Sequence, residues 1–104
     1  MTRFFEDFTD EELKRFKEVF GDNAEYNDDR VLLHQPDGFY DEITFLKHDD
    51  DFYVEHYEED AEYYEMENRV YLLDTTWWEK VNMEQILADY ENGQEIDPNE
   101  YSLD

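Results

Sequence analysis

Ten carboxylates fall within the nineteen residues from Asp49 to Glu67, and no Lys or Arg interrupts them. In a chain this rich in acids, a pair of carboxylates says little about acid–base catalysis. A dense array of them favours electrostatic binding of a basic protein surface instead. We therefore predict a contact surface with Tyr53, Tyr57 and Tyr63 as aromatic anchors. Its residues are Asp49, Asp50, Asp51, Tyr53, Glu55, Tyr57, Glu58, Glu59, Asp60, Glu62, Tyr63, Glu65 and Glu67.

Two simpler explanations of the acidity stay open. One is a solvated surface without function, although like charges facing each other across strands destabilise a sheet. The other is adaptation to high salt, which would spread the charge evenly along the chain and would need no acidic stretch. The concentration of acids between Asp49 and Glu67 favours a binding function over both.

Other chemistry has weaker support. Three acidic stretches could hold Ca²⁺, but none has the alternating acids and central glycine of an EF-hand loop. They are Asn27-Asp28-Asp29, Asp49-Asp50-Asp51 and Asp97-Pro98-Asn99-Glu100. The three histidines, His34, His48 and His56, lack the four well-placed ligands of a zinc site. The glycines are isolated and Ser102 is the only serine. We expect no cofactor, no dedicated metal site and no enzymatic activity.

Charge restricts the partners. The 104 residues carry 32 Asp and Glu against 8 Lys and Arg, a net charge of −24, which repels nucleic acids and anionic membranes. Such acidity often accompanies disorder, but 8 Phe, 9 Tyr and 2 Trp can fill a small core. We predict one folded domain over 1–104. The absence of cysteine and of an apolar leader predicts a cytoplasmic protein, in the host cytoplasm if a phage encodes it.

Two helices are predicted at the ends of the chain. Thr9 and Glu12 have the spacing of a capping box, and Gly21 suits the end of the first helix. Asn82 and Gln85 repeat the capping pattern before a helix that ends near Gly93. After it, residues 95–104 are predicted to be a polar tail.

Between the helices the hydrophobic period changes to two, which indicates strands. Five are predicted, at residues 30–35, 39–47, 52–57, 63–67 and 69–74. The sheet face that is open to solvent would carry Tyr53, Glu55, Tyr57, Tyr63, Glu65 and Glu67. Glu58, Glu59 and Asp60 would lie in a loop. Trp77 and Trp78 are expected to pack in the core. The fold class is α+β, with both helices on one face of an antiparallel sheet.

The size, acidity and aromatic-rich core resemble the DNA-mimic inhibitors of phages and mobile elements, a class that includes anti-restriction proteins, anti-CRISPR proteins and inhibitors of uracil-DNA glycosylase. A compact domain of this length is roughly 33 Å across. Duplex DNA of that length carries about 19 charges, close to the net 24 here. The resemblance rests on composition and transfers no residue role. It implies an inhibitor that occupies the nucleic-acid-binding surface of a basic nuclease, restriction or CRISPR effector, or glycosylase.

Two other functions stay open. Immunity proteins that neutralise nuclease toxins are also small and acidic. An acidic adaptor or chaperone for basic proteins would fit the same composition. A mimic excludes nucleic acid from its target, whereas an adaptor need not. The sequence leaves homodimerisation open as well.

Overall fold

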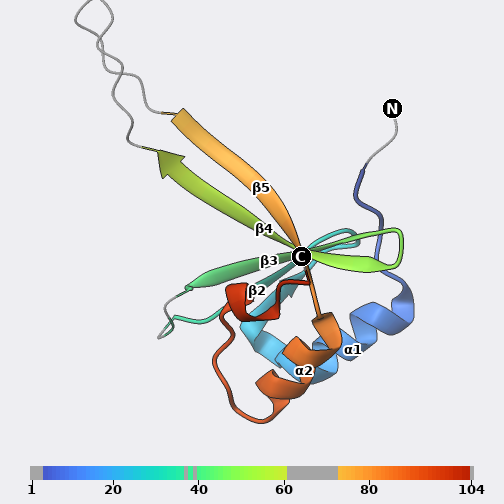
Figure 1. Cartoon of the computed structure of the whole chain (residues 1–104). Coiled ribbons are helices and arrows are strands. Elements are labelled where there is room, and N and C mark those ends of the chain that lie inside the picture. Colours follow the sequence, from blue (N-terminus) through green and yellow to red (C-terminus); the bar gives the residue numbers. More distant parts are fainter. Residues whose placement is uncertain (1–3, 37, 39, 61–72, 104) are drawn as a thin grey trace, which may run out of the picture.

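The protein is an α+β structure in which two helices cover one face of a five-stranded antiparallel sheet (Figure 1). The computed structural model describes residues 4–36, 38, 40–60 and 73–103, with the backbone alone for 58–60 and 73–75. The strands are ordered β1-β2-β3-β4-β5, each beside its neighbour in sequence. The elements are α1 (Asp10–Phe20), a 3₁₀ turn η1 (Gly21–Asn23), β1 (Ala24–Tyr26), β2 (Val31–His34), β3 (Glu42–His48), β4 (Asp51–Asp60), β5 (Leu73–Val81), α2 (Met83–Glu91) and a 3₁₀ turn η2 (Pro98–Tyr101).

Helix α1 begins as its sequence predicts. The Thr9 hydroxyl accepts the Glu12 N–H at 3.1 Å, and the Glu12 carboxylate accepts the Thr9 N–H at 2.8 Å. This reciprocal pair satisfies two backbone donors that the first turn leaves open. At the other end Gly21 adopts a φ of 56°, a conformation that glycine takes without steric cost.

Helix α2 has only half of the predicted capping box. The Asn82 side chain accepts the Gln85 N–H at 3.2 Å, as expected. The reciprocal bond is absent because the Asn82 N–H donates to the Tyr101 carbonyl and the Gln85 side chain donates to Asp89. The C-terminal segment therefore takes the place of one capping partner.

In the described residues the sheet has five strands, of which three are predicted ones and two, β1 and β5, are not. Strands β2, β3 and β4 lie where alternation indicates them, and β4 continues through Glu58, Glu59 and Asp60, which pair with β5 rather than forming a loop. Strand β1 has three residues, too few to show a period. Strand β5 contains Thr75-Thr76-Trp77-Trp78, which does not alternate. The hairpin predicted over 63–67 and 69–74 lies mostly outside the described residues.

The core lies between the helices and the inner face of the sheet. Alternation places Phe45 of β3 and Val54 of β4 on this face, and both are buried. Phe20 of α1 stacks on Phe45 with ring centroids 5.8 Å apart, and Ile86 of α2 is fully buried. Aromatic rings thus supply much of the apolar area that holds this small fold together.

The predicted polar tail is wrong, because the C-terminal segment packs onto the core. Ile96 is fully buried, and Tyr101 is 8% exposed. The Gln35 side chain binds both the N–H and the carbonyl of Ile96, at 2.8 and 3.0 Å. Ser102 then forms a bridge with Val81 of β5. The prediction missed this because the apolar residues stand singly among polar ones.

Candidate partner-binding surface

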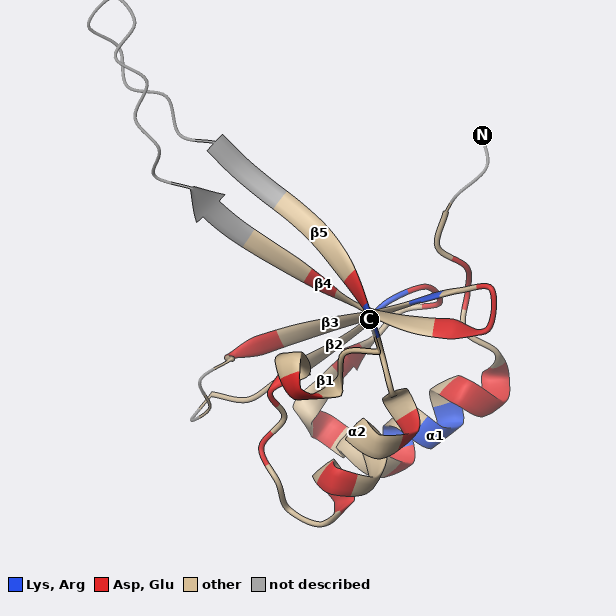
Figure 2. Cartoon of the chain, viewed as in Figure 1, with Lys and Arg blue, Asp and Glu red and all other residues tan. Residues whose placement is uncertain are grey.

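One end of the molecule gathers acids from three segments: the chain before α1, the first turn of α1, and the β3–β4 turn (Figure 2). Asp49 and Asp50 form this two-residue turn, both with positive φ, 53° and 67°. Glu6 is drawn to the turn by accepting the Asp49 N–H at 2.6 Å. Asp51 begins β4 and lies 3.2 Å from the Lys80 ammonium. Asp49 and Asp50 are both exposed in this turn.

The sheet face opposite the helices carries the next three predicted contact residues. Strand alternation places Tyr53, Glu55 and Tyr57 of β4 on this open face, opposite Lys80, Trp78 and Thr76 of β5 in the pairing register. Tyr57 is 63% exposed. These three side chains therefore share one surface, as the sequence predicts.

Glu55 is less available than its sequence context suggests. Its carboxylate accepts the Trp78 indole N–H at 3.1 Å and lies 3.8 Å from the Arg30 guanidinium. The carboxylate that a basic partner would bind is therefore already engaged in an ion pair and a hydrogen bond. Glu55 contributes to the shape of the open face more than to its free charge.

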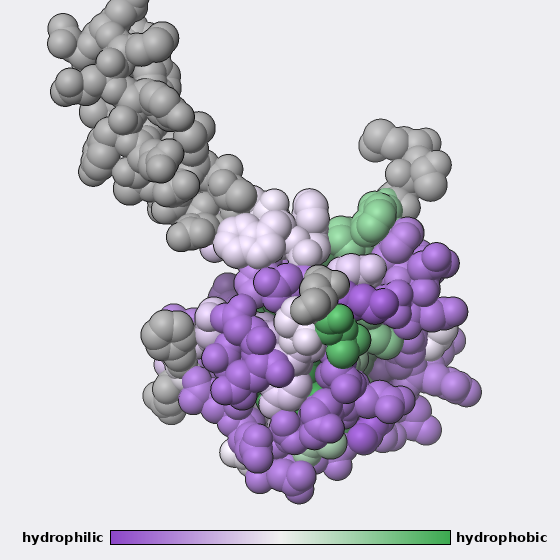
Figure 3. Space-filling model, viewed as in Figure 1, coloured by the Kyte–Doolittle hydropathy of each residue, from purple (hydrophilic) through white to green (hydrophobic). Residues whose placement is uncertain are grey.

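Aromatic residues make up much of the same face. Phe5, from the segment before α1, packs against Tyr53 and Trp78 with ring centroids 6.0 and 5.5 Å apart. Figure 3 shows weakly polar and hydrophobic side chains on the side from which β4 and β5 project, beside a body that is mostly hydrophilic. Trp, Tyr and Phe are enriched in the cores of protein interfaces.

The tryptophan pair is on the surface, which corrects the prediction that it packs in the core. Trp77 is 37% exposed and Trp78 47% exposed, and strand alternation places them on opposite faces of β5. Trp77 stacks on His56 of β4 at 5.2 Å. The His56 Nε2 is buried without a hydrogen-bond partner, 3.7 Å from the Glu79 carboxylate.

The remaining predicted contact residues extend along and beyond β4. The backbone of Glu58, Glu59 and Asp60 pairs with Thr75, Asp74 and Leu73 of β5. Because β3 pairs with β4 only as far as Glu55, this part of the hairpin projects from the sheet as two strands. Glu62, Tyr63, Glu65 and Glu67 lie outside the described residues.

A partly buried ion pair lies beneath the acidic end. Lys47 of β3 points to the helical side, where its ammonium donates to the Glu12 carboxylate at 2.8 Å. Burial opposes ionisation of Glu12, but the hydrogen bonds from Lys47 and Thr9 outweigh it and hold its pKa below the usual value. The hydrogen bond to Glu12 raises the pKa of Lys47 despite burial. Both groups stay charged near neutral pH and hold α1 against the sheet.

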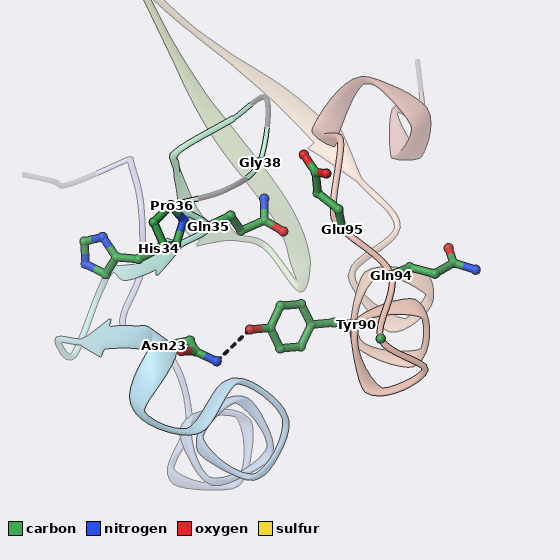
Figure 4. A pocket seen from close by; sticks show the side chains of 9 residues that line it. Asn23, His34, Gln35, Pro36, Gly38, Tyr90, Gln94 and Glu95 are labelled. Atoms are coloured by element: carbon green, nitrogen blue, oxygen red, sulfur yellow. Dashed lines mark hydrogen bonds between the residues drawn. The ribbon is translucent and has the colours of Figure 1, made fainter.

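Two clefts flank this core. The first, of about 670 Å³, has the Lys47–Glu12 pair on its wall and an acidic rim that includes Glu11, Asp50 and Glu84. The second, of about 510 Å³, lies between β2 and the segment after α2, where Asn23 donates to the Tyr90 hydroxyl at 3.0 Å (Figure 4). The segment after α2 packs closely against the β2–β3 connection here, because a Cβ on Gly38 would lie 2.6 Å from the Glu95 carboxylate.

Metal ligands do not converge in the described parts of the chain. No group of three or more His, Asp and Glu side chains among those residues could hold a metal ion. His34 lies between Glu25 and Glu42 at 3.4 and 3.7 Å, and His48 is 3.8 Å from Glu6. The histidines thus serve as local partners for the surplus of carboxylates.

None of the helices in the described residues is long and apolar enough to cross a membrane. No protein family, curated protein or solved structure matches the chain.

Proposed function

We propose that the protein inhibits a basic nucleic-acid-binding protein by presenting carboxylates where DNA or RNA would bind. One observation carries the proposal: among the residues whose side chains the structure describes, no Asp or Glu is buried, in a chain of net charge −24. The folded scaffold holds these charges in fixed positions, so little conformational entropy is lost when a basic groove binds them.

The proposed inhibitor acts by occupancy, without turnover and without a cofactor. Its target is a nuclease, a restriction or CRISPR effector, or a glycosylase, whose groove is lined by Lys and Arg. Two parts of the surface would contribute: the acidic end around Asp49 and Asp50 and the open face around Tyr53 and Tyr57. Encounter would take place in the cytoplasm, that of the host if a phage encodes the protein. The charge would speed this encounter.

A competition assay tests the proposal. The partner is captured from host lysate, identified by mass spectrometry and purified, and its binding to labelled DNA or RNA is measured as the inhibitor is added. We expect displacement of nucleic acid and an affinity that falls steeply with NaCl, because salt screens the charge pairs. A ternary complex with nucleic acid, or an affinity independent of salt, would contradict mimicry.

The double variant Asp49→Asn, Asp50→Gly separates charge from fold. Two-residue hairpins with positive φ at both positions favour Asn-Gly, so the variant should be more stable by up to about 1 kcal/mol. Removal of two exposed charges should weaken binding to the captured partner about 5-fold. Unchanged affinity in a correctly folded variant would show that the acidic end takes no part.

An immunity protein for a nuclease toxin is the second candidate. The exposed aromatic side chains of Tyr57, Trp77 and Trp78 favour it, because such residues form hot spots in tightly packed protein interfaces. The same competition assay distinguishes the two functions. An immunity protein that binds beside the substrate groove would inhibit the toxin without displacing nucleic acid, and its affinity would depend less on salt.

A further inference from the structure

Strand β5 is an edge of the sheet. Its neighbour is β4 on one side, and Figure 1 shows it along the outer side of the hairpin. The opposite edge, β1, is only three residues long, a length that limits pairing with other chains. Strand β5 has nine residues and offers a much longer edge.

The hydrogen bonds of the C-terminal segment identify which groups face outward. The Leu103 N–H donates to the Lys80 carbonyl at 2.9 Å, on the side of β5 away from β4. Because the direction alternates along an antiparallel strand, the N–H and C=O of Trp78 and Thr76 face the same way as those of Lys80. No described residue bonds to these outward groups. These outward N–H and C=O groups, which we call the open ladder, lie in line with the Lys80 carbonyl that the C-terminal segment binds.

The middle of this edge lacks the usual protection against pairing, because the charged residues of β5, which are Asp74, Glu79 and Lys80, lie toward its ends. Natural edge strands carry Lys, Pro or bulges that stop other chains from adding. Thr75 to Trp78 is an uncharged run of residues that favour strands, in a chain where 38% of the residues are charged. Both tryptophans beside the edge are exposed, one on each face. An extended peptide could add here, with pockets for alternate side chains.

Charge determines which peptide fits. A second copy of the chain would bring a further net charge of −24 to the edge. A basic strand would instead place a Lys or Arg over the ring of Trp78, which is 47% exposed. On the other face Glu79 provides a carboxylate that is 30% exposed.

We propose that β5 binds an extended, Lys- or Arg-rich segment of the partner as a sixth antiparallel strand, through the backbone of Thr76 and Trp78. The basic character of that segment rests on the proposed function. The open ladder rests on the geometry of β5 alone. Main-chain bonds would supply affinity at this edge, while the basic side chains would supply selectivity.

Two short peptides of equal charge test the proposal at fixed ionic strength: one alternates Lys with Val, and the other has the same sequence with every backbone nitrogen methylated. The methylated peptide has no backbone N–H on either side and cannot extend a sheet. We expect the Lys-Val peptide to bind at least about tenfold more tightly, the difference made by one or two backbone hydrogen bonds. It should also slow amide hydrogen exchange at Thr76 and Trp78. Equal affinity without such protection would overturn strand addition.

The variant Thr76→Pro removes one outward N–H and leaves the β4–β5 ladder intact, since Pro is tolerated on the solvent side of edge strands. It should bind the Lys-Val peptide about tenfold more weakly, whereas the matched control Thr76→Val should bind as the native chain does. Slow amide exchange at Thr76 without peptide, together with a dimer in sedimentation, would mean that a second copy of the chain pairs with β5. That result would contradict binding of a basic segment. If no variant binds the peptide but Thr76→Pro still displaces nucleic acid, then β5 is not a binding edge. The proposed inhibition would be unaffected by that result.

Discussion

Lys47 shows how a single residue departs from the pattern of the whole chain. In a protein with so few cations, this one lies on the helical side of the sheet, 6% exposed, where an apolar residue would be expected. Its partner Glu12 also completes the capping box of α1. One carboxylate therefore links the start of a helix to the middle strand of the sheet.

We expect Lys47→Met to lower the free energy of unfolding at neutral pH by roughly 1–2 kcal/mol, through loss of a charge-assisted hydrogen bond from a partly exposed acceptor. Denaturant titration measures it. The matched control is Lys14→Met on the exposed face of α1, which should change stability by less than about 0.5 kcal/mol.

The pH dependence of this difference follows from the pKa shifts. The lowered pKa of Glu12 gives stability that is present above its usual value of 4.5 and is lost as the pH falls through the folded pKa. The raised pKa of Lys47 gives stability that is lost only as the pH rises above 10.5. The native chain and Lys47→Met should therefore converge in strongly acidic solution. A constant difference down to the acid limit would contradict the ion pair.

At the scale of elements, the C-terminal segment owes its conformation to contacts with residues that are distant in the sequence. Gln35 of the β2–β3 connection holds the backbone of Ile96, and Asn82 at the start of α2 donates to the Tyr101 carbonyl. The Tyr101 hydroxyl in turn donates to Asp89 of α2 at 2.6 Å, and burial together with this bond raises the Tyr101 pKa. The segment thus closes the sheet edge beside Val81.

Ile96→Ala should destabilise the protein by about 2–4 kcal/mol, because it leaves a cavity at a fully buried site. Leu103→Ala is the matched control: this side chain is 55% exposed and its loss should cost less than about 0.5 kcal/mol. Thermal or chemical unfolding compares the two variants. Equal, small effects would mean that the segment is the polar tail that its composition suggests.

At the scale of the whole molecule, repulsion among surface carboxylates opposes folding. Four of the described Lys and Arg side chains form ion pairs, those of Arg15, Arg30, Lys47 and Lys80, in a chain where 32 Asp and Glu face only 8 Lys and Arg. Asp and Glu lie on both helices, in the turns and at the strand ends (Figure 2). Stability and affinity should therefore respond to salt in opposite directions.

We expect the melting temperature at about pH 8 to rise by roughly 5 °C between about 0.05 M and 0.5 M NaCl, as shorter screening lengths weaken the repulsion. Choline chloride should act equally, because screening depends on ionic strength and not on a bound sodium ion. A flat response would mean that the carboxylates are too far apart to repel each other, which would remove the support for a DNA-like array.

The sequence by itself determined the fold class, both helices, the central strands and the surface placement of the acids. These follow from local rules: capping residues at fixed spacing, hydrophobic periods of two and 3.6, and the high cost of burying a charge. For the same reason Tyr53, Glu55 and Tyr57 were correctly predicted to share a face.

Tertiary structure alone decided what depends on residues distant in sequence. The pairing of Glu55 with Arg30, the burial of Lys47 against Glu12 and the docking of Ile96 onto Gln35 join segments that no local pattern relates. Strand β5 forms because β4 offers it a partner, not because Thr75 to Trp78 alternates. The exposure of both tryptophans follows from their place at an edge, since a residue at the edge of a sheet lacks the neighbours that would bury it.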